Sequence, residues 1–187
     1  MAVYTISQGE KVTASILNTY AMNAGLVFVK QVTVGSAVAT VDVTSCFSAE
    51  YDNYLVSYSG IASTNSAIGL TAYLLSGTTP TANGWYGNTY YVVTAGAGAL
   101  TNNPLSNTAY CEVGGLRSGD INSGTFEVNA PFRANYTRTT FMCATSDYWR
   151  IGAYSHNAST SYNGIRVAPT AGTITGGTVT VYGRRIQ

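Results

Sequence analysis

Residues 125–132, Thr-Phe-Glu-Val-Asn-Ala-Pro-Phe, alternate apolar with mostly polar side chains. When such a chain is extended, the even-numbered residues from Phe126 to Phe132 share one face, while Glu127 and Asn129 lie on the other. A period of two is typical of a strand in an antiparallel sheet that buries one face. The stretch therefore predicts a core built from sheets.

Short segments of similar character recur along the chain and are separated by turn clusters such as residues 76–80 and 102–104. Many short strands with this punctuation predict a mainly β protein, an antiparallel β-sandwich of jelly-roll type. Gly35-Ser36 predicts a hairpin between the first two segments. The expected strands are 26–34, 38–43, 54–61, 68–75, 85–94, 108–114, 125–132, 139–145, 148–154, 164–167 and 178–183.

Residues 12–25, Val-Thr-Ala-Ser-Ile-Leu-Asn-Thr-Tyr-Ala-Met-Asn-Ala-Gly, predict one short α-helix over 13–24. Thr13 is a suitable N-cap and Gly25 a suitable terminator. Such a short helix is unstable alone, so its apolar stripe must be covered by the protein's own sandwich, a neighbouring subunit or a host particle. We expect residues 1–25 to form an N-terminal segment and residues 26–187 one β-sandwich domain.

The surface is expected to be polar but almost uncharged. Charged residues make up 9% of the chain, against roughly 25% in typical soluble domains, and the formal net charge is +1. The balance gives no electrostatic reason to expect nucleic acid or an acidic membrane as partner. A neutral surface rich in Tyr, Asn, Thr and Ser suits a subunit fixed in an assembly, or one that touches sugars.

The cysteines indicate neither a disulfide framework nor a metal site. Cys46, Cys111 and Cys143 are far apart, odd in number and placed in strand-like runs, so we expect small buried apolar residues. No cofactor is implied. No stretch approaches the ~20 apolar residues of a membrane span, and no signal-like segment opens the chain, so synthesis in a cytoplasm is expected.

The pattern does not favour an enzyme. His156 is the only histidine, and no GxSxG-like turn accompanies it, so a structural role is the simpler interpretation. A glycosidase needs two opposed carboxylates. Glu50 and Asp52 are close in sequence, but capping and turn stabilisation explain them more simply.

Aromatic residues crowd the segment that follows a Pro/Gly/Asn turn cluster. Trp85, Tyr86 and Tyr90 lie there beside neutral Asn and Thr side chains, and planar rings of this kind can stack on pyranose faces. The competing interpretation is that they fill the core, as aromatic residues in strands commonly do. Both interpretations stay open, and on the first of them the three residues are a candidate glycan contact.

The N-terminal sequence resembles a start found in many minor structural proteins of tailed phages. Residues 9–20 match the pattern G-x-x-(L/V)-T-A-x-x-L-N-x-Y, and residues 47–56 and 174–183 resemble recurring tail-fibre or head-fibre elements. The resemblance implies a homotrimeric jelly-roll protein of the virion that attaches through its N-terminal segment. The expected particle-docking residues are Val12, Ile16, Leu17 and Tyr20.

Three functions follow as hypotheses. The first is a tail fibre or receptor-binding protein that displays its β-sandwich for attachment to a host surface glycan. The second is a capsid decoration or head fibre protein, docked on the head by its N-terminal segment. The third, from another class, is a small polysaccharide depolymerase that uses Glu50 or Asp52.

Overall fold

A computed structural model describes residues 11, 13, 25–65, 68–93, 100–146 and 148–184, except for the side chains of Val92 and Val93. This part of the chain is mainly β, and its strands form two antiparallel sheets. The strands are β1 (Leu26–Val34), β2 (Val41–Val43), β3 (Asn53–Ser63), β4 (Ile68–Ser76), β5 (Thr79–Pro80), β6 (Trp85–Val93), β7 (Leu100–Thr108), β8 (Cys111–Leu116), β9 (Asn122–Asn129), β10 (Thr137–Ala144), β11 (Tyr148–His156), β12 (Gly164–Pro169) and β13 (Ile174–Arg184).

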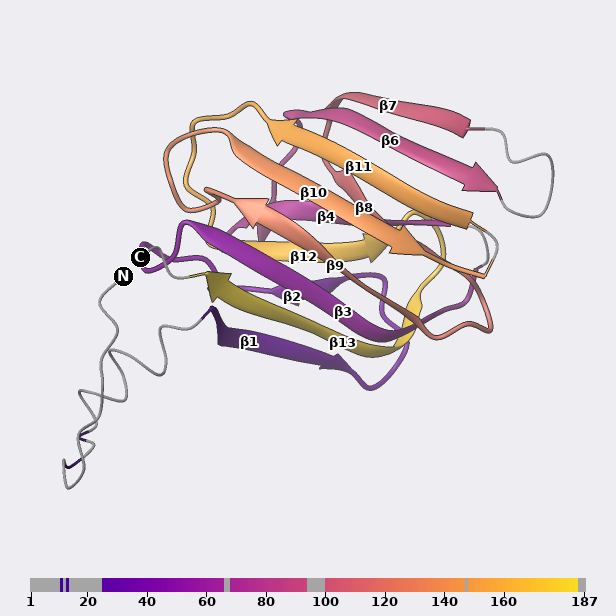
Figure 1. Cartoon of the computed structure of the whole chain (residues 1–187), viewed down its shortest axis with the longest axis horizontal. Helices are drawn as coiled ribbons and strands as arrows, with labels where there is room; N and C mark the ends of the chain where they lie inside the picture. The colour runs from indigo at the N-terminus through magenta and orange to yellow at the C-terminus, as the bar shows by residue number, and fades with distance from the viewer. Residues whose placement is uncertain are drawn as a thin grey trace.

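The larger sheet has eight strands in the order β1-β13-β3-β9-β10-β11-β6-β7 (Figure 1). Leu26 pairs with Arg184, so the described β unit begins and ends at the same end of this sheet. We call this the terminal end and the opposite one the distal end.

The smaller sheet has five strands. Its order is β2-β12-β4-β5, and β8 also pairs with β4. Consecutive strands from β1 to β4 alternate between the two sheets, and β8 and β9 alternate in the same way, as do β12 and β13. The chain therefore links the two layers repeatedly, and most pairings join segments that are distant in sequence.

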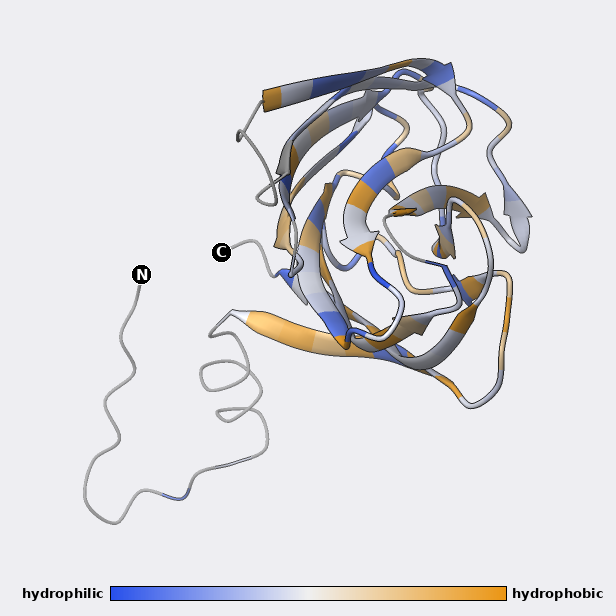
Figure 2. Ribbon diagram, turned by 90° about the vertical axis from the view of Figure 1, so that its right-hand side faces the viewer, coloured by the Kyte–Doolittle hydropathy of each residue, from blue (hydrophilic) through white to orange (hydrophobic). Residues whose placement is uncertain are grey.

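The core lies between the two sheets. Val56, Phe126 and Phe141 are cross-strand neighbours on the inner face of the larger sheet, while Leu74 and Ile165 are paired in the smaller one. All five are buried, and burying a large apolar side chain stabilises a fold by roughly 1.5–3 kcal/mol. Apolar and polar residues alternate along the strands, as Figure 2 shows, so each inner face supplies apolar side chains to this core.

The predicted hairpin around Gly35-Ser36 is wrong. The first strand is β1, as expected, but it pairs with β13, whereas β2 pairs with β12 in the other sheet. The second strand is also shorter than expected, and Val38 forms only an isolated bridge with Ile174. Because β1 and β2 lie in different sheets, Val34 of β1 and Val41 and Val43 of β2 all join the core between the sheets.

The predicted turn at residues 102–104 is wrong as well. Asn102, Asn103 and Pro104 lie inside β7, where Pro104 pairs with Asn88 of β6. Proline cannot donate to a sheet ladder, but β7 is an edge strand, where one row of donors has no neighbour to bond. The polar sequence of β7 therefore suits an edge strand, which pairs with β6 alone.

The predicted helix over residues 13–24 lies outside the described residues, except for Thr13. Within the described part there is no helix, and accordingly none that is long and apolar enough to cross a membrane.

Candidate binding surface on the outer face of the larger sheet

The outer face of the eight-stranded sheet presents side chains in rows that cross the strands, because paired residues point to the same side. The middle row runs across five strands: Leu55, Glu127, Thr140, Ala153 and Asn88. The next row lies nearer the distal end: Thr125, Met142, Ile151 and Tyr90.

A hollow of about 670 Å³ lies over these two rows, and we call it the sheet hollow. Thr140 and Ala153 are small, while Met142 and Ile151 stand beside them two residues along their strands. The difference in side-chain size creates the depression. Its lining is mainly apolar and contains a few polar groups, as in ordinary ligand sites.

The polar groups of the sheet hollow are almost uncharged. Asn88 donates from Nδ2 to the Tyr90 hydroxyl over 3.4 Å, and its Oδ1 is buried without a hydrogen-bond partner. Glu127 is the one ionisable carboxylate of the lining, and Arg184 donates to it over 2.5 Å. A neutral ligand with hydroxyl groups would meet an aromatic ring with its hydroxyl and two threonine side chains.

The structure separates the three candidate glycan residues. Tyr86 and Tyr90 project from the outer face and are exposed, and Tyr90 lines the sheet hollow. Trp85 is only 1% exposed because it points inward and packs edge-on against His156 at 5.1 Å. Trp85 is therefore a core residue and not a surface contact. Neighbouring side chains of a strand point to opposite faces, so Trp85 and Tyr86 cannot both face outward.

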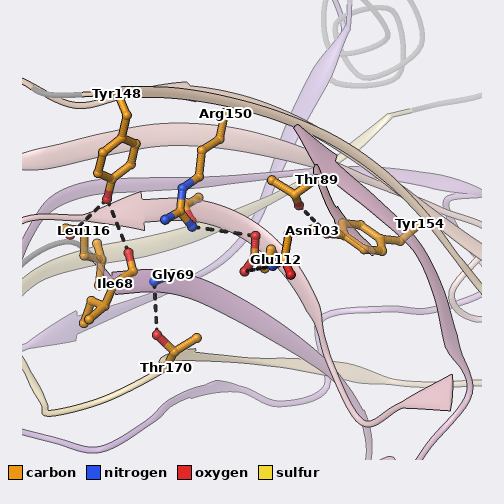
Figure 3. A network of polar contacts seen from close by, with 11 residues as sticks. Ile68, Gly69, Thr89, Asn103, Glu112, Leu116, Tyr148, Arg150, Tyr154 and Thr170 are labelled. Carbon is orange, nitrogen blue, oxygen red and sulfur yellow. Dashed lines mark hydrogen bonds and ion pairs between the residues drawn. The ribbon is translucent and has the colours of Figure 1, made fainter. Parts of the chain in front are cut away.

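A network of polar side chains links the sheets through the interior (Figure 3). Arg150 of β11 lies 3.6 Å from the Glu112 carboxylate of β8, and Asn103 donates to the same carboxylate over 3.1 Å. The Arg150 guanidinium stacks over the rings of Tyr148 and Tyr91, at 4.7 and 5.4 Å from their centroids. The charged pair thus joins two layers that share no backbone ladder.

His156 is a buried structural residue. Its Nε2 lies 2.9 Å from the Asn83 carbonyl, which can only accept, so Nε2 carries the proton. Its Nδ1 lies 3.5 Å from the Tyr162 hydroxyl. Burial lowers the pKa of His156 below its ordinary value. Gly84 has φ +120° and lies so close that a Cβ there would be 2.7 Å from Nε2.

Glu50 and Asp52, the candidate catalytic carboxylates, each interact with a neighbouring side chain. Asp52 forms an ion pair with Arg133, and Glu50 accepts a hydrogen bond from the Tyr51 hydroxyl at 3.2 Å. Neither lines the sheet hollow. These contacts fit the predicted stabilisation of the turn that enters β3.

The three cysteines are buried, which confirms the expectation of small core residues, and their thiols are free. Burial raises the pKa of Cys46 to about 12, and it also raises the pKa values of Cys111 and Cys143. Thiols of this kind are poor nucleophiles at neutral pH. Across the described ranges, no group of three or more His, Cys, Asp or Glu side chains is placed to hold a metal ion.

The predicted docking residues Val12, Ile16, Leu17 and Tyr20 lie outside the described residues.

Comparison of the chain with protein families, with curated proteins and with solved structures gave no significant match.

Sequence reasoning missed Met142, Ile151 and Asn88 as surface residues of a candidate site. A usable signal was present in residues 148–156, where the exposed Trp149 and Ile151 alternate with the buried Tyr148, Arg150 and Tyr154, so both faces of the strand carry large side chains. A strand that is apolar on its solvent face indicates a contact surface.

Proposed function

We propose that this chain is a structural protein of a tailed-phage particle, of tail-fibre or receptor-binding type, without catalytic activity. The observation that carries the proposal is the sheet hollow, which combines an aromatic ring and neutral hydrogen-bonding groups with one arginine-paired carboxylate. This lining suits contact with a neutral host-surface glycan. It lacks the opposed carboxylates that glycoside hydrolysis requires.

The strand order supports a jelly-roll sandwich. The strands β1-β13-β3-β9 form one four-stranded half, and β2-β12-β4 with β8 form the other. In this scheme β5 to β7 and the hairpin of β10 and β11 are insertions. Strands β10, β11, β6 and β7 widen the first sheet, and the sheet hollow lies over β10, β11 and β6 of this added part and extends over β9 to Leu55 of β3.

The N-terminal pattern supports docking by residues 1–25, with Val12, Ile16, Leu17 and Tyr20 as the contacts and a homotrimer as the assembly. We expect Leu17→Asp to abolish incorporation into particles, because a buried carboxylate is strongly disfavoured. The β domain should keep its circular dichroism spectrum. Loss of folded protein would instead assign residue 17 to the domain's own core.

Adsorption competition tests the attachment role. Purified protein added to host cells should reduce phage adsorption, and Tyr90→Ala should weaken this effect at least tenfold while leaving the fold intact. Tyr136→Ala is the matched control, because Tyr136 is similarly exposed but lies in the loop between β9 and β10. Protein that neither binds host cells nor competes would refute the attachment role. Release of reducing sugar that is lost in Glu50 or Asp52 variants would favour a depolymerase instead.

A capsid decoration or head fibre protein is the second candidate. Leu26 and Phe28 project from the edge strand β1 and are exposed at the terminal end of the sheet. An apolar edge beside the N-terminal segment suits docking on a capsid lattice. Immunogold labelling of isolated heads and isolated tails separates the two locations.

A further inference from the structure

An uncharged apolar patch lies on the outer face of the larger sheet, over the distal part of β10, β11, β6 and β7. Its members are large side chains from four adjacent strands: Tyr90, Leu100, Met142, Trp149 and Ile151. Met142 pairs with Ile151, which pairs with Tyr90. Leu100 and Trp149 both pair with Val92, so they stand on the same side of the sheet.

The exposure of this apolar patch is large for a solvent-facing surface. Met142 is 70% exposed and Leu100 is 61% exposed. Since large side chains present about 150–250 Å² each when fully exposed, the five together expose on the order of 500 Å². That is near the upper end for the largest patch on a typical monomer, roughly 300–600 Å².

No charged side chain interrupts the apolar patch among the described residues of these rows. Their remaining described side chains are neutral: Ser57, Thr125, Asn102, Ala144, Thr180 and Gln31. Glu127 and Arg138 lie on this face in rows closer to the terminal end. Asp120, in the loop between β8 and β9, lies beyond the distal edge of the patch, where it accepts a hydrogen bond from Ser146. Two copies of the patch can therefore meet without bringing like charges together.

We infer that a second copy of this chain covers the apolar patch. A standard interface buries about 800 Å² per partner, and the patch with its neutral polar rim supplies an area of that order. The aliphatic side chains of Met142, Leu100 and Ile151 offer nothing to the hydroxyl groups of a saccharide. A self-complementary surface also needs no partner other than the chain itself.

This assignment leaves the sheet hollow at the border of the contact. The two surfaces share Tyr90, Met142 and Ile151, so the contact covers the distal row of the sheet hollow. The middle row, on the terminal side of Tyr90, stays open to a ligand, and the Tyr90 hydroxyl faces it through the hydrogen bond from Asn88. The inference rests on the homo-oligomer part of the proposed function, and it holds for either location in the particle.

The test is light scattering after size-exclusion chromatography on the full-length protein and two variants. The wild type should have a mass two or three times 19.6 kDa. Ile151→Lys should have the monomer mass with an unchanged circular dichroism spectrum, because it places lysines against one another across the contact. Met142→Lys should also have the monomer mass. Agreement between the two variants would show that the loss of the oligomer does not come from a folding defect of one of them.

Tyr136→Lys is the control, since Tyr136 is 42% exposed and Ile151 44% exposed, and it should keep the oligomer mass. A monomeric wild type at micromolar concentrations would overturn the inference, as would an oligomer that survives both patch variants. A monomeric wild type that still competes for phage adsorption would overturn only this inference. Its apolar patch would then be assigned to a host ligand or to the chain's own N-terminal segment.

Discussion

Arg150 and Glu112 show how single residues connect the two layers of this protein. The pair lies between β11 and β8, which belong to different sheets, and both side chains are about nine-tenths buried. Removing two charges from water is costly, and their attraction offsets this cost only while both partners are present. The pair therefore favours one alignment of the sheets over slipped ones.

Replacing Glu112 by Ala should lower the free energy of unfolding by about 3–5 kcal/mol, because Arg150 is left buried without its carboxylate. Equilibrium denaturation in urea measures the change. Glu127→Ala is the control, since its ion pair with Arg184 is exposed and should contribute less than about 1 kcal/mol. Equal losses in both variants would contradict a structural role for the interior pair.

His156 makes stability depend on pH in a defined direction. In the unfolded chain a histidine titrates near pH 6.5, and burial lowers the pKa of His156 in the folded state. Below about pH 6.5 the histidine of the unfolded state binds a proton, whereas the buried His156 of the folded state binds it more weakly. The free energy of unfolding therefore falls as pH decreases. Above that pH the residue contributes no pH dependence.

The measurement is the melting temperature of the wild type and of His156→Gln between about pH 7.5 and 5.5, which spans the histidine titration. The wild type should lose stability over this range, and the variant should lose less. A variant with the same pH dependence as the wild type would assign the effect to other groups.

At the scale of the elements, most strands were predictable to within a few residues because side-chain alternation is a local property. The strand β1 matches its expected bounds, and β6 and β11 begin where they were predicted to begin. The strand β7 was missed because its Asn and Pro residues favour turns, while its position at a sheet edge tolerates them.

Close backbone contact shapes the pairing of β3 with β13, whose register shifts near Gly177. Gly177 has φ +101°, and a Cβ there would lie 2.6 Å from backbone atoms of Gly60. Gly177→Ala should therefore lower the free energy of unfolding by about 1–3 kcal/mol through a strained backbone conformation. Gly176→Ala is the matched control, because nothing lies within 4 Å of its added Cβ. Similar denaturation midpoints for the two variants would contradict the assigned contact.

At the scale of the whole molecule, the buried core of the described residues joins side chains of both sheets. Its buried members extend from Val34 to Val181. We therefore expect a chain that begins at Gly25 to fold with a melting temperature within a few degrees of the full-length protein. A large decrease, measured by calorimetry, would show that residues 1–24 pack on the domain.

The candidate surface was only partly accessible from the sequence. Tyr86 and Tyr90 were identified because aromatic residues beside neutral polar groups are recognisable locally. Trp85 was wrongly placed on the surface because the strands that pair with β6 and the sheet that packs on it determine which of its faces points inward. The sheet hollow itself arises from Thr140 and Ala153 on two strands, and only their pairing brings these small residues together.

The sequence by itself determined that this chain is mainly β, that its cysteines are buried and that its charge is low, because alternation and composition act within a few residues. The tertiary structure alone decided which strands pair, since β1 and β2 are adjacent in sequence but belong to different sheets. It also decided that Tyr90, Met142 and Ile151 stand side by side. The physical reason is that pairing is selected by the apolar surface buried across the whole core, which no single segment contains.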